Sequence, residues 1–338
     1  MGFLDEINTY TNKHIVPGVV DNVFKNDPLL AYMKANQPET FPGGAAIQEN
    51  FMYGTLMGGA YAKGATFDIT RVQHTTGATF QPKFYEVNVT EFKEDIQVTV
   101  KGPHAVFSMI DADMANAALT MSAILAIAQY NEGQSSTRAN HLNGLAEALN
   151  DGSVSSWTAA SYSTYGSLTR SGTIGSALNS TPVSIAGTIT YNALEEYYST
   201  AVIGTEEPNL GITTNLGFAY IKEKFQPQQR FTEEDIKIGF RGLRFNSSII
   251  MRSQYCPGTQ GVNDARLGNY LASAGETLWF LNTKYFRLWV TDDPEFAFGF
   301  SGFKPAQDSN VVAGQYFFSG NMTCQAPRLQ KQLYAITG

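Results

Sequence analysis

The sequence predicts an α+β protein organised around one long helix. Three observations lead to this prediction. Residues 101–133 are the longest run with high helix propensity throughout, and residues 54–82 are rich in Gly and Thr, as in an extended β-hairpin. Residues 278–324 contain short runs rich in aromatic side chains, which favour strands. Shorter helix and strand patterns between these regions complete the α+β interpretation.

The long helix has recognisable ends. Pro103 is tolerated in a first helical turn, Gly133 is typical of a helix end, and Ser108 is an alternative start. Residues 114–128 are almost all Ala, Leu, Ile and Met, so nearly the whole circumference must be covered. We therefore expect a buried spine helix, roughly 40 Å long.

A membrane-spanning helix is the alternative interpretation of this run. Its composition disfavours a span, because Ala, Ser and Asn are frequent where a lipid-facing helix favours Leu, Ile and Val. Basic flanking residues are also missing. We expect no membrane partner.

Composition indicates a protein whose surface meets other protein. Only 16% of the 338 residues are charged, against about a quarter in typical soluble domains, and 22 Phe and 17 Tyr must be covered. The net charge of −7 opposes tight nucleic-acid binding. Cys256 and Cys324 are far apart without a second pair, which fits a reducing compartment, and the acidic N-terminus does not resemble a signal peptide.

Residues 1–50 are predicted to be an extended arm, because Pro, Gly and Asn recur along them. Two short apolar patches, at 15–20 and 29–33, need a surface to lie on. A disordered leader is the alternative, although the aliphatic and aromatic content is high for one.

The hairpin is predicted over residues 54–82, with residues 84–92 as its return strand and 96–100 as a further strand. It has too few apolar residues for a core of its own, so we expect it to lie on a neighbouring subunit. The candidate contact residues are Leu56, Met57, Tyr61, Lys63, Phe67, Ile69, Val72 and Phe80.

The middle of the chain is predicted to be mixed. Leu194, Tyr197 and Tyr198 have helical spacing within 190–203, where Thr190 is a plausible N-cap. The other expected elements are short helices at 143–152 and 217–225, strands at 236–240 and 249–252, and a Gly- and Asn-rich excursion at 257–275.

The C-terminal region has predicted strands at 278–281, 285–290, 296–300, 314–318 and 321–324. Two runs there, TLWFLNTKYFRLWV (277–290) and GFKPAQDSNVVAGQYFFSGNMTCQAPRLQKQL (302–333), resemble the C-terminal signature of tailed-bacteriophage major capsid proteins. Upstream, TYGSLTRS (164–171), FQPQQRF (225–231) and GLRFNSSIIMRSQYC (242–256) occur in the order expected of that family. The resemblance extends from about residue 80 to the end. The basic cluster around Arg328 and Lys331 is sparser than in the family, which speaks against direct DNA contact.

The resemblance implies the Hong Kong 97 capsid fold. The N-terminal arm would be residues 1–50, and the extended loop residues 51–92. The peripheral domain with its spine helix would comprise 93–145 and 276–338, and the axial domain 146–275. The long helix, the Gly-rich hairpin and the mixed region, each predicted from the residues alone, take the corresponding positions.

The function implied is that of a major capsid protein, which forms pentamers and hexamers that close into an icosahedral shell around double-stranded DNA without reading its sequence. A separate scaffolding protein and a portal are the expected partners, with decoration proteins as further candidates. The protein would be assembled in the bacterial cytoplasm and reside in the virion. An encapsulin-type compartment and a β-rich binding module are the alternatives.

We expect no enzymatic activity, cofactor or metal. The four histidines lack metal-ligand spacing, and neither cysteine lies in a nucleophile motif. Acidic pairs such as Asp111 with Asp113 are most simply charges at a helix start. By analogy with the family, Lys63 is a candidate donor for a crosslink to an Asn. A lone lysine gives no sign of the buried setting this reaction needs, so we interpret Lys63 as solvated.

Overall fold

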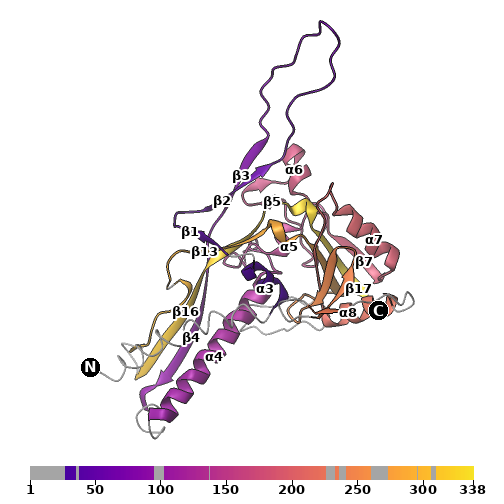
Figure 1. The fold of residues 1–338 in the computed structure, drawn as a ribbon. Coiled ribbons are helices and arrows are strands. Elements are labelled where there is room, and N and C mark those ends of the chain that lie inside the picture. The colour runs from indigo at the N-terminus through magenta and orange to yellow at the C-terminus, as the bar shows by residue number, and fades with distance from the viewer. Residues whose placement is uncertain are drawn as a thin grey trace.

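A computed structural model of the protein describes residues 27–35, 38–94, 103–136, 138–225, 233–235, 241–259, 273–294, 296–305 and 310–338. Figure 1 shows two sheets, a long helix packed along one of them, and a loop that projects far from the body. The predicted α+β class is confirmed by this arrangement. The predicted strands at 96–100 and 236–240 lie outside the described residues.

One sheet has six strands and is centred on a single long strand, β16 (Val311–Cys324). The sequence predicted two strands here, and that prediction is wrong because the ladder continues through Gly320. A Cβ atom on Gly320 would lie 2.1 Å from the Trp289 carbonyl oxygen, so only glycine allows this approach. The partners of β16 are β4 (Lys83–Phe92), β13 (Phe286–Thr291), β14 (Ala297–Phe300) and β15 (Lys304–Pro305), while β1 (Glu39–Phe41) runs parallel to β13.

Helix α4 (Pro103–Ala128) packs along β4 and β16, and the Tyr316 hydroxyl donates to Met114 Sδ at 3.2 Å (Figure 1). It ends before the predicted Gly133, because the chain tightens into a turn in which Tyr130 N–H bonds the Ile127 carbonyl. Its last turns, residues 121–128, are buried except for the half-buried Ile124, but Leu119 is 51% exposed, so the helix is not covered all round. Among the described residues, no helix, α4 included, is both long enough and apolar enough to cross a bilayer.

The second sheet has seven strands and combines segments far apart in sequence. Its order is β7 (Val183–Thr188), β17 (Lys331–Thr337), β12 (Glu276–Leu281), β8 (Leu210–Thr213), β11 (Ser248–Arg252), β10 (Arg241–Phe245) and β9 (Glu233–Asp235). Strands β12 and β17 come from residues 276–338, which the sequence assigned to the peripheral domain. The seven-stranded sheet therefore contains strands from both sides of the predicted boundary at residue 276, and the division into domains stays a prediction.

Strand β12 is buried along its whole length and separates two hydrophobic cores. Trp279 and Leu281 face the larger core, which α4 also lines, whereas Leu278 and Phe280 face the smaller one. Helices α7 (Tyr191–Thr200) and α8 (Asn215–Phe225) contribute to the smaller core. The predicted N-cap of α7 is confirmed, since Thr190 Oγ1 accepts a hydrogen bond from Ala193 N.

The N-terminal segment from residue 27 onward belongs to the body of the subunit. Helix α3 (Pro28–Ala35) packs against β13 and buries Leu29, Leu30 and Met33. The part of the predicted arm that forms α3 therefore packs on the body of the subunit, while residues 1–26 lie outside the described part of the chain. The apolar patch at 29–33 finds its covering surface within the same subunit.

Short elements join the two sheets: α5 (Leu145–Ala148), β5 (Thr164–Tyr165), β6 (Leu168–Thr169), α6 (Gly172–Leu178), η5 (Thr283–Tyr285) and η6 (Pro327–Leu329). The buried Arg170 holds several of them by donating hydrogen bonds to the carbonyls of Glu147, Ala148, Asn150 and Leu178. One buried guanidinium thus supplies a hydrogen-bond donor to four backbone carbonyls, and the carbonyls in turn satisfy the buried Nη1–H and Nη2–H groups of Arg170.

Candidate intersubunit surface

The most exposed feature of the subunit is the projecting loop, residues 53–74, which rises from a short two-stranded base (Figure 1). The base pairs β2 (Ile47–Met52) with β3 (Thr75–Phe80), and Tyr53 N–H extends it by bonding the His74 carbonyl at 2.9 Å. The predicted hairpin is thus ordered into strands only at its base. The predicted strand at 84–92 is confirmed as β4, but its predicted pairing within the hairpin is wrong, because β4 pairs with β16.

Apolar side chains on the projecting loop face solvent. Ile69 is 93% exposed, and the other large apolar side chains are exposed by more than half: Leu56, Met57, Tyr61 and Phe67. Lys63 is exposed and Val72 is half-buried. A contiguous set of exposed apolar side chains on one segment is typical of a surface that another protein covers.

The end of the loop has local order despite its exposure. The rings of Tyr61 and Phe67 lie 4.9 Å apart in an edge-to-face arrangement, so the fold brings together two of the predicted contact residues. Ala65 N–H bonds the Ala62 carbonyl at 3.0 Å, and Asp68 Oδ1 accepts from Thr70 N. These local contacts preorganise the loop end, which lowers the entropy lost when a partner covers it.

Phe80 does not belong to this surface. It is 2% exposed in the single subunit, and its ring packs edge-to-face on Tyr165 at 5.0 Å. Gly166, with φ +53°, fits beside it, since a Cβ there would lie 2.5 Å from the Phe80 ring. The prediction of Phe80 as an intersubunit contact is therefore corrected, because its side chain anchors the loop base in the subunit core.

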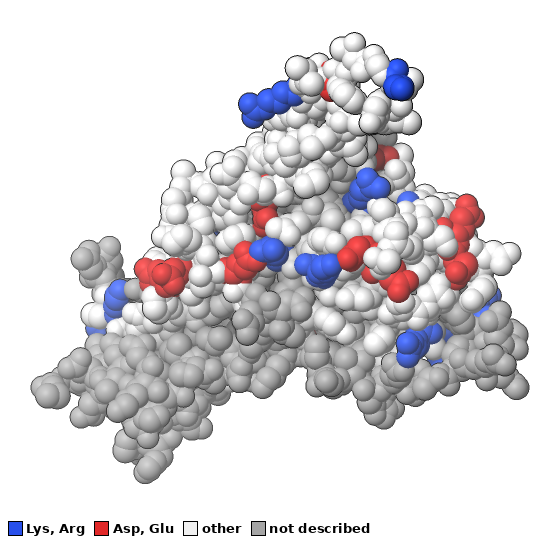
Figure 2. All heavy atoms as spheres, turned by 45° about the horizontal axis from the view of Figure 1, so that its top comes forward, with Lys and Arg blue, Asp and Glu red and all other residues white. Residues whose placement is uncertain are grey.

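Charge on the projecting loop is sparse and slightly basic. Its charged residues are Lys63, Arg71 and Asp68. Figure 2 shows the loop as mostly uncharged atoms with separate basic groups, above a body on which acidic and basic side chains lie together. The loop thus presents an apolar strip with a small excess of positive charge.

A second exposed aromatic surface lies on the six-stranded sheet, on the face opposite α4. Alternate residues of β4 point to this face, and Phe84 and Phe92 are 65% and 56% exposed. Phe317 of β16 lies in register opposite Glu86, and its ring stacks on the partly exposed Phe296 at 5.1 Å. This surface was not predicted from the sequence. Aromatic residues at both ends of the alternating run 84–92 were the signal that could have identified it.

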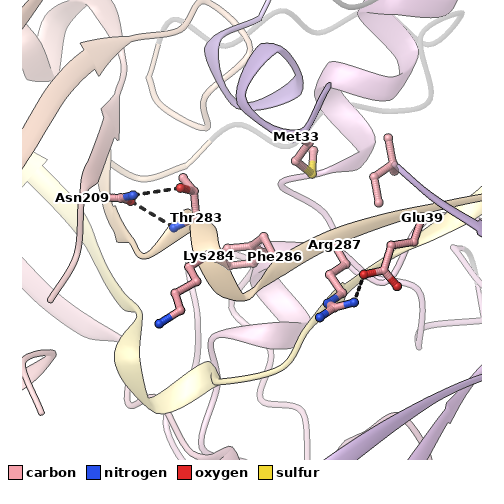
Figure 3. Close-up of a pocket in the computed structure, with 8 residues that line it drawn as sticks. Met33, Glu39, Asn209, Thr283, Lys284, Phe286 and Arg287 are labelled. Atoms are coloured by element: carbon pink, nitrogen blue, oxygen red, sulfur yellow. Dashed lines mark hydrogen bonds and ion pairs between the residues drawn. The ribbon is translucent and has the colours of Figure 1, made fainter. Parts of the chain in front are cut away.

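A polar pocket of about 440 Å³ lies where the N-terminal segment meets both sheets (Figure 3). Its charged groups are already paired: Arg287 with Glu39, and Lys284 Nζ with Glu206 at 2.7 Å. Asn209 exchanges two hydrogen bonds with Thr283 at the other end. This arrangement joins segments of the subunit and contains no paired nucleophile and base among its lining residues.

Other ionisable groups of the described residues point to structural roles. Groups of three or more His, Cys, Asp or Glu side chains that could hold a metal are absent from the described ranges. Burial raises the pKa of both cysteine thiols, which disfavours the reactive thiolate. Burial also raises the pKa of Asp27, whose carboxylate accepts bonds from Gln129, Ser253 and the first turn of α3.

Comparison with known proteins finds similarity at the level of structure. No family model and no curated protein sequence matches the chain. Solved structures do: the cyanophage A-1(L) capsid (TM-score 0.59, 12% identity, 93% of each chain covered) and Mycobacterium phage Ogopogo (0.52, 11%, 92% of each). The holo-SrpI encapsulin of Synechococcus elongatus PCC 7942 matches at a TM-score of 0.56 with 8% identity, covering 90% of this chain and 87% of the encapsulin.

At these identities the similarity establishes the fold. It extends over at least nine-tenths of the chain and includes a cyanophage capsid, a Mycobacterium phage structure and an encapsulin complex. The projecting loop, the spine helix and the two sheets are therefore parts of a Hong Kong 97 capsid fold.

Proposed function

We propose that this chain is the major capsid protein of a tailed double-stranded DNA bacteriophage. In this proposal it forms pentamers and hexamers that close into an icosahedral shell. The observation that supports it most directly is the projecting loop, whose apolar side chains are exposed in the subunit and contribute to neither core. Burying apolar surface lowers the free energy by about 25 cal/mol per Å², so we expect another protein surface to cover these side chains. Heterologous contacts repeated around rotation axes would provide one.

The proposed partners follow from the same function. Copies of the chain would cover the projecting loop, and a separate scaffolding protein and a portal would direct closure. Decoration proteins would bind the outside, and the exposed aromatic face of the six-stranded sheet is a second surface for any of these contacts. The shell would form in the bacterial cytoplasm and persist as the virion capsid. The assignment of residues 51–92 as the extended loop, and of 93–145 with 276–338 as the peripheral domain, remains part of this proposal.

Imaging of the purified protein tests the proposal. Negative-stain micrographs and sedimentation should reveal capsomers or closed shells, either alone or after addition of the phage's scaffolding protein. A strictly monomeric protein at high concentration under both conditions would contradict the proposal, and would favour the binding-module alternative.

An encapsulin-type compartment is the second candidate, favoured by the similarity to the SrpI encapsulin. The contents of shells isolated from cells that naturally produce the protein separate the two. Packaged double-stranded DNA supports the phage capsid, whereas a co-purifying enzyme without DNA supports the compartment. With its net charge of −7, the subunit should bind free DNA weakly at physiological salt and without sequence preference.

A further inference from the structure

The base of the projecting loop belongs to neither of the two large sheets. Strands β2 and β3 form a separate two-stranded sheet, so the direction of the base relative to the body depends on contacts other than a shared ladder. On β2, buried and exposed residues alternate, and the buried ones are Ile47, Glu49 and Phe51. The inward face of β2 therefore has a carboxylate between two apolar side chains.

Three side chains of the body donate hydrogen bonds to this carboxylate. Trp289 Nε1 of β13 and Thr323 Oγ1 of β16 donate to Glu49 Oε1 at 2.8 and 2.7 Å. Gln325 Nε2, just after β16, donates to Oε2 at 2.7 Å. Glu49 is 3% exposed, and all three donors are neutral. An ionised carboxylate accepts bonds from several directions at once, so these donors together offset the cost of its burial.

The donors have fixed positions on the six-stranded sheet. The ladder of β13 with β16 places Arg287 opposite Thr323, so Trp289, two residues further on, shares the face of Thr323. Trp289 Nε1 also donates to Thr323 Oγ1 at 3.1 Å, which holds the two side chains together. The six-stranded sheet thus presents a rigid set of donors to β2.

The other strand of the base is attached to a different part of the body. Thr79 N–H of β3 donates to the Gly166 carbonyl at 2.9 Å, and Phe80 packs on Tyr165. Both partners lie in the hairpin of β5 with β6. The base is therefore attached at two places, through β3 to this hairpin and through Glu49 to the six-stranded sheet. Without the second attachment the base could turn about the first.

A small turn at the base becomes a large movement at the end of the projecting loop, which lies far from the body in Figure 1. Each limb of the loop has about eleven residues and could extend roughly 35 Å. A turn of about 10° would then move the loop end by roughly 6 Å, more than the distance that separates side chains in contact. The direction of the base therefore decides which surface the exposed apolar side chains can meet.

We propose that Glu49 is a positioning residue for assembly, whose carboxylate sets the direction in which the projecting loop leaves the subunit. Hydrophobic packing of Ile47 and Phe51 is non-directional and keeps the base in the core, whereas the three hydrogen bonds to Glu49 select one orientation. The inference rests on the proposed assembly function, but the direction of the base is a property of the single subunit and can be measured there.

The distance between two spin labels in the unassembled subunit tests the proposal. One label is attached at Thr75→Cys, exposed on β3, and the other at Glu196→Cys, exposed on α7, while both native cysteines are buried. Double electron–electron resonance should give one narrow distance distribution with Glu49 present. Glu49→Leu removes every acceptor and keeps the inward face of β2 apolar. It should broaden or displace the distribution while circular dichroism stays native.

Two matched variants sharpen the test. Glu49→Gln should keep the narrow distribution, because its amide oxygen can accept from the donors on β13 and β16. Gln325 can rotate its amide to present an oxygen to the new NH2 group. Gln48→Leu makes the same kind of change on the exposed face of β2 and should leave the distribution unchanged. In a separate assembly reaction, Glu49→Leu should form several-fold fewer shells than Glu49→Gln.

A narrow, unshifted distribution in folded Glu49→Leu would overturn the proposal. Equal broadening in Gln48→Leu and Glu49→Leu would do so as well, because any change in β2 would then loosen the base. If Glu49→Leu does not fold, Gln325→Ala decides, since it keeps the carboxylate and removes one donor at a half-buried site. A broader distribution in Gln325→Ala supports the proposal, and an unchanged one overturns it. Failure of the wild-type protein to form shells would contradict the proposed function instead, and the distances would still test Glu49.

Discussion

Strand β12 and the projecting loop use apolar side chains in opposite ways. All six residues of β12 are buried, and residues 278–281 contribute alternately to two cores on opposite faces of the strand. The loop carries apolar side chains of similar size, yet Ile69 and its neighbours face solvent. The comparison separates residues that fold the subunit from residues available for assembly. Each region therefore predicts a different consequence of mutation.

The largest expected effect on folding is at Trp279 of β12. Its side chain is fully buried, its Nε1 donates to Thr277 Oγ1 at 3.2 Å, and its ring lies near Tyr130. Trp279→Ala should lower the free energy of unfolding by about 3–5 kcal/mol, because a large cavity is left in the core. Chemical denaturation of the unassembled subunit measures this. A loss below about 1 kcal/mol would show that β12 is not central to the fold.

The next largest effect is that the contribution of Asp27 to the free energy of unfolding should depend on pH. Burial raises its folded-state pKa, so the stability contributed by this group is present below the unfolded pKa of about 3.9 and is lost as pH rises through the folded value. The difference in unfolding free energy between wild type and Asp27→Asn should therefore fall as pH rises from about 4.

Asp151→Asn is a control with the opposite sign. Burial raises the pKa of Asp151, but hydrogen bonds from Val154 and Ser153 outweigh it, and the net shift is downward. The difference in unfolding free energy between wild type and Asp151→Asn should therefore fall as pH drops through the folded-state pKa of Asp151. A pH-independent difference for Asp27→Asn would contradict the account of its burial.

A smaller effect is expected at the N-cap of α7. Thr190→Ala removes the bond to Ala193 N and should cost about 1 kcal/mol, whereas Thr190→Ser should retain most of it. Since α7, which Thr190 caps, lies apart from the projecting loop in Figure 1, neither variant should change assembly. Thermal unfolding measures the first effect and sedimentation of assembled material the second. Equal stability of the two variants would show that the cap bond contributes nothing.

The sequence predicted those features that depend on neighbouring residues. The cap at Thr190, the helix near 103–128 and the strand at 249–252 follow from local spacing. Features set by distant partners were missed. Phe80 is buried because Gly166 leaves room beside Tyr165, and β16 is continuous because Gly320 admits Trp289. Asn143 donates to Glu147 and accepts from Asn321, which in turn donates to the Gln81 carbonyl; these residues come from three segments distant in sequence, so no local pattern revealed the cluster.

Within the projecting loop, point changes should affect stability least of all. Phe67→Ser combined with Ile69→Ser exchanges exposed apolar side chains for polar ones and should change the free energy of unfolding by no more than about 0.5 kcal/mol. Particle yield should nevertheless fall, because covering polar side chains gains less than covering apolar ones. Equal particle yield in a side-by-side assembly reaction would contradict a contact role for these two residues.

Replacing Leu56–Arg71 with an Asn-Gly turn tests the central claim most directly, since it removes the exposed strip and keeps the base pairing of Tyr53 with His74. The two quantities to measure are the melting temperature of the subunit and the fraction of protein that sediments as shells. We predict a near-native melting temperature and no shells. Normal shells from the shortened protein, or a subunit that no longer folds, would contradict the assignment of the projecting loop as an assembly surface.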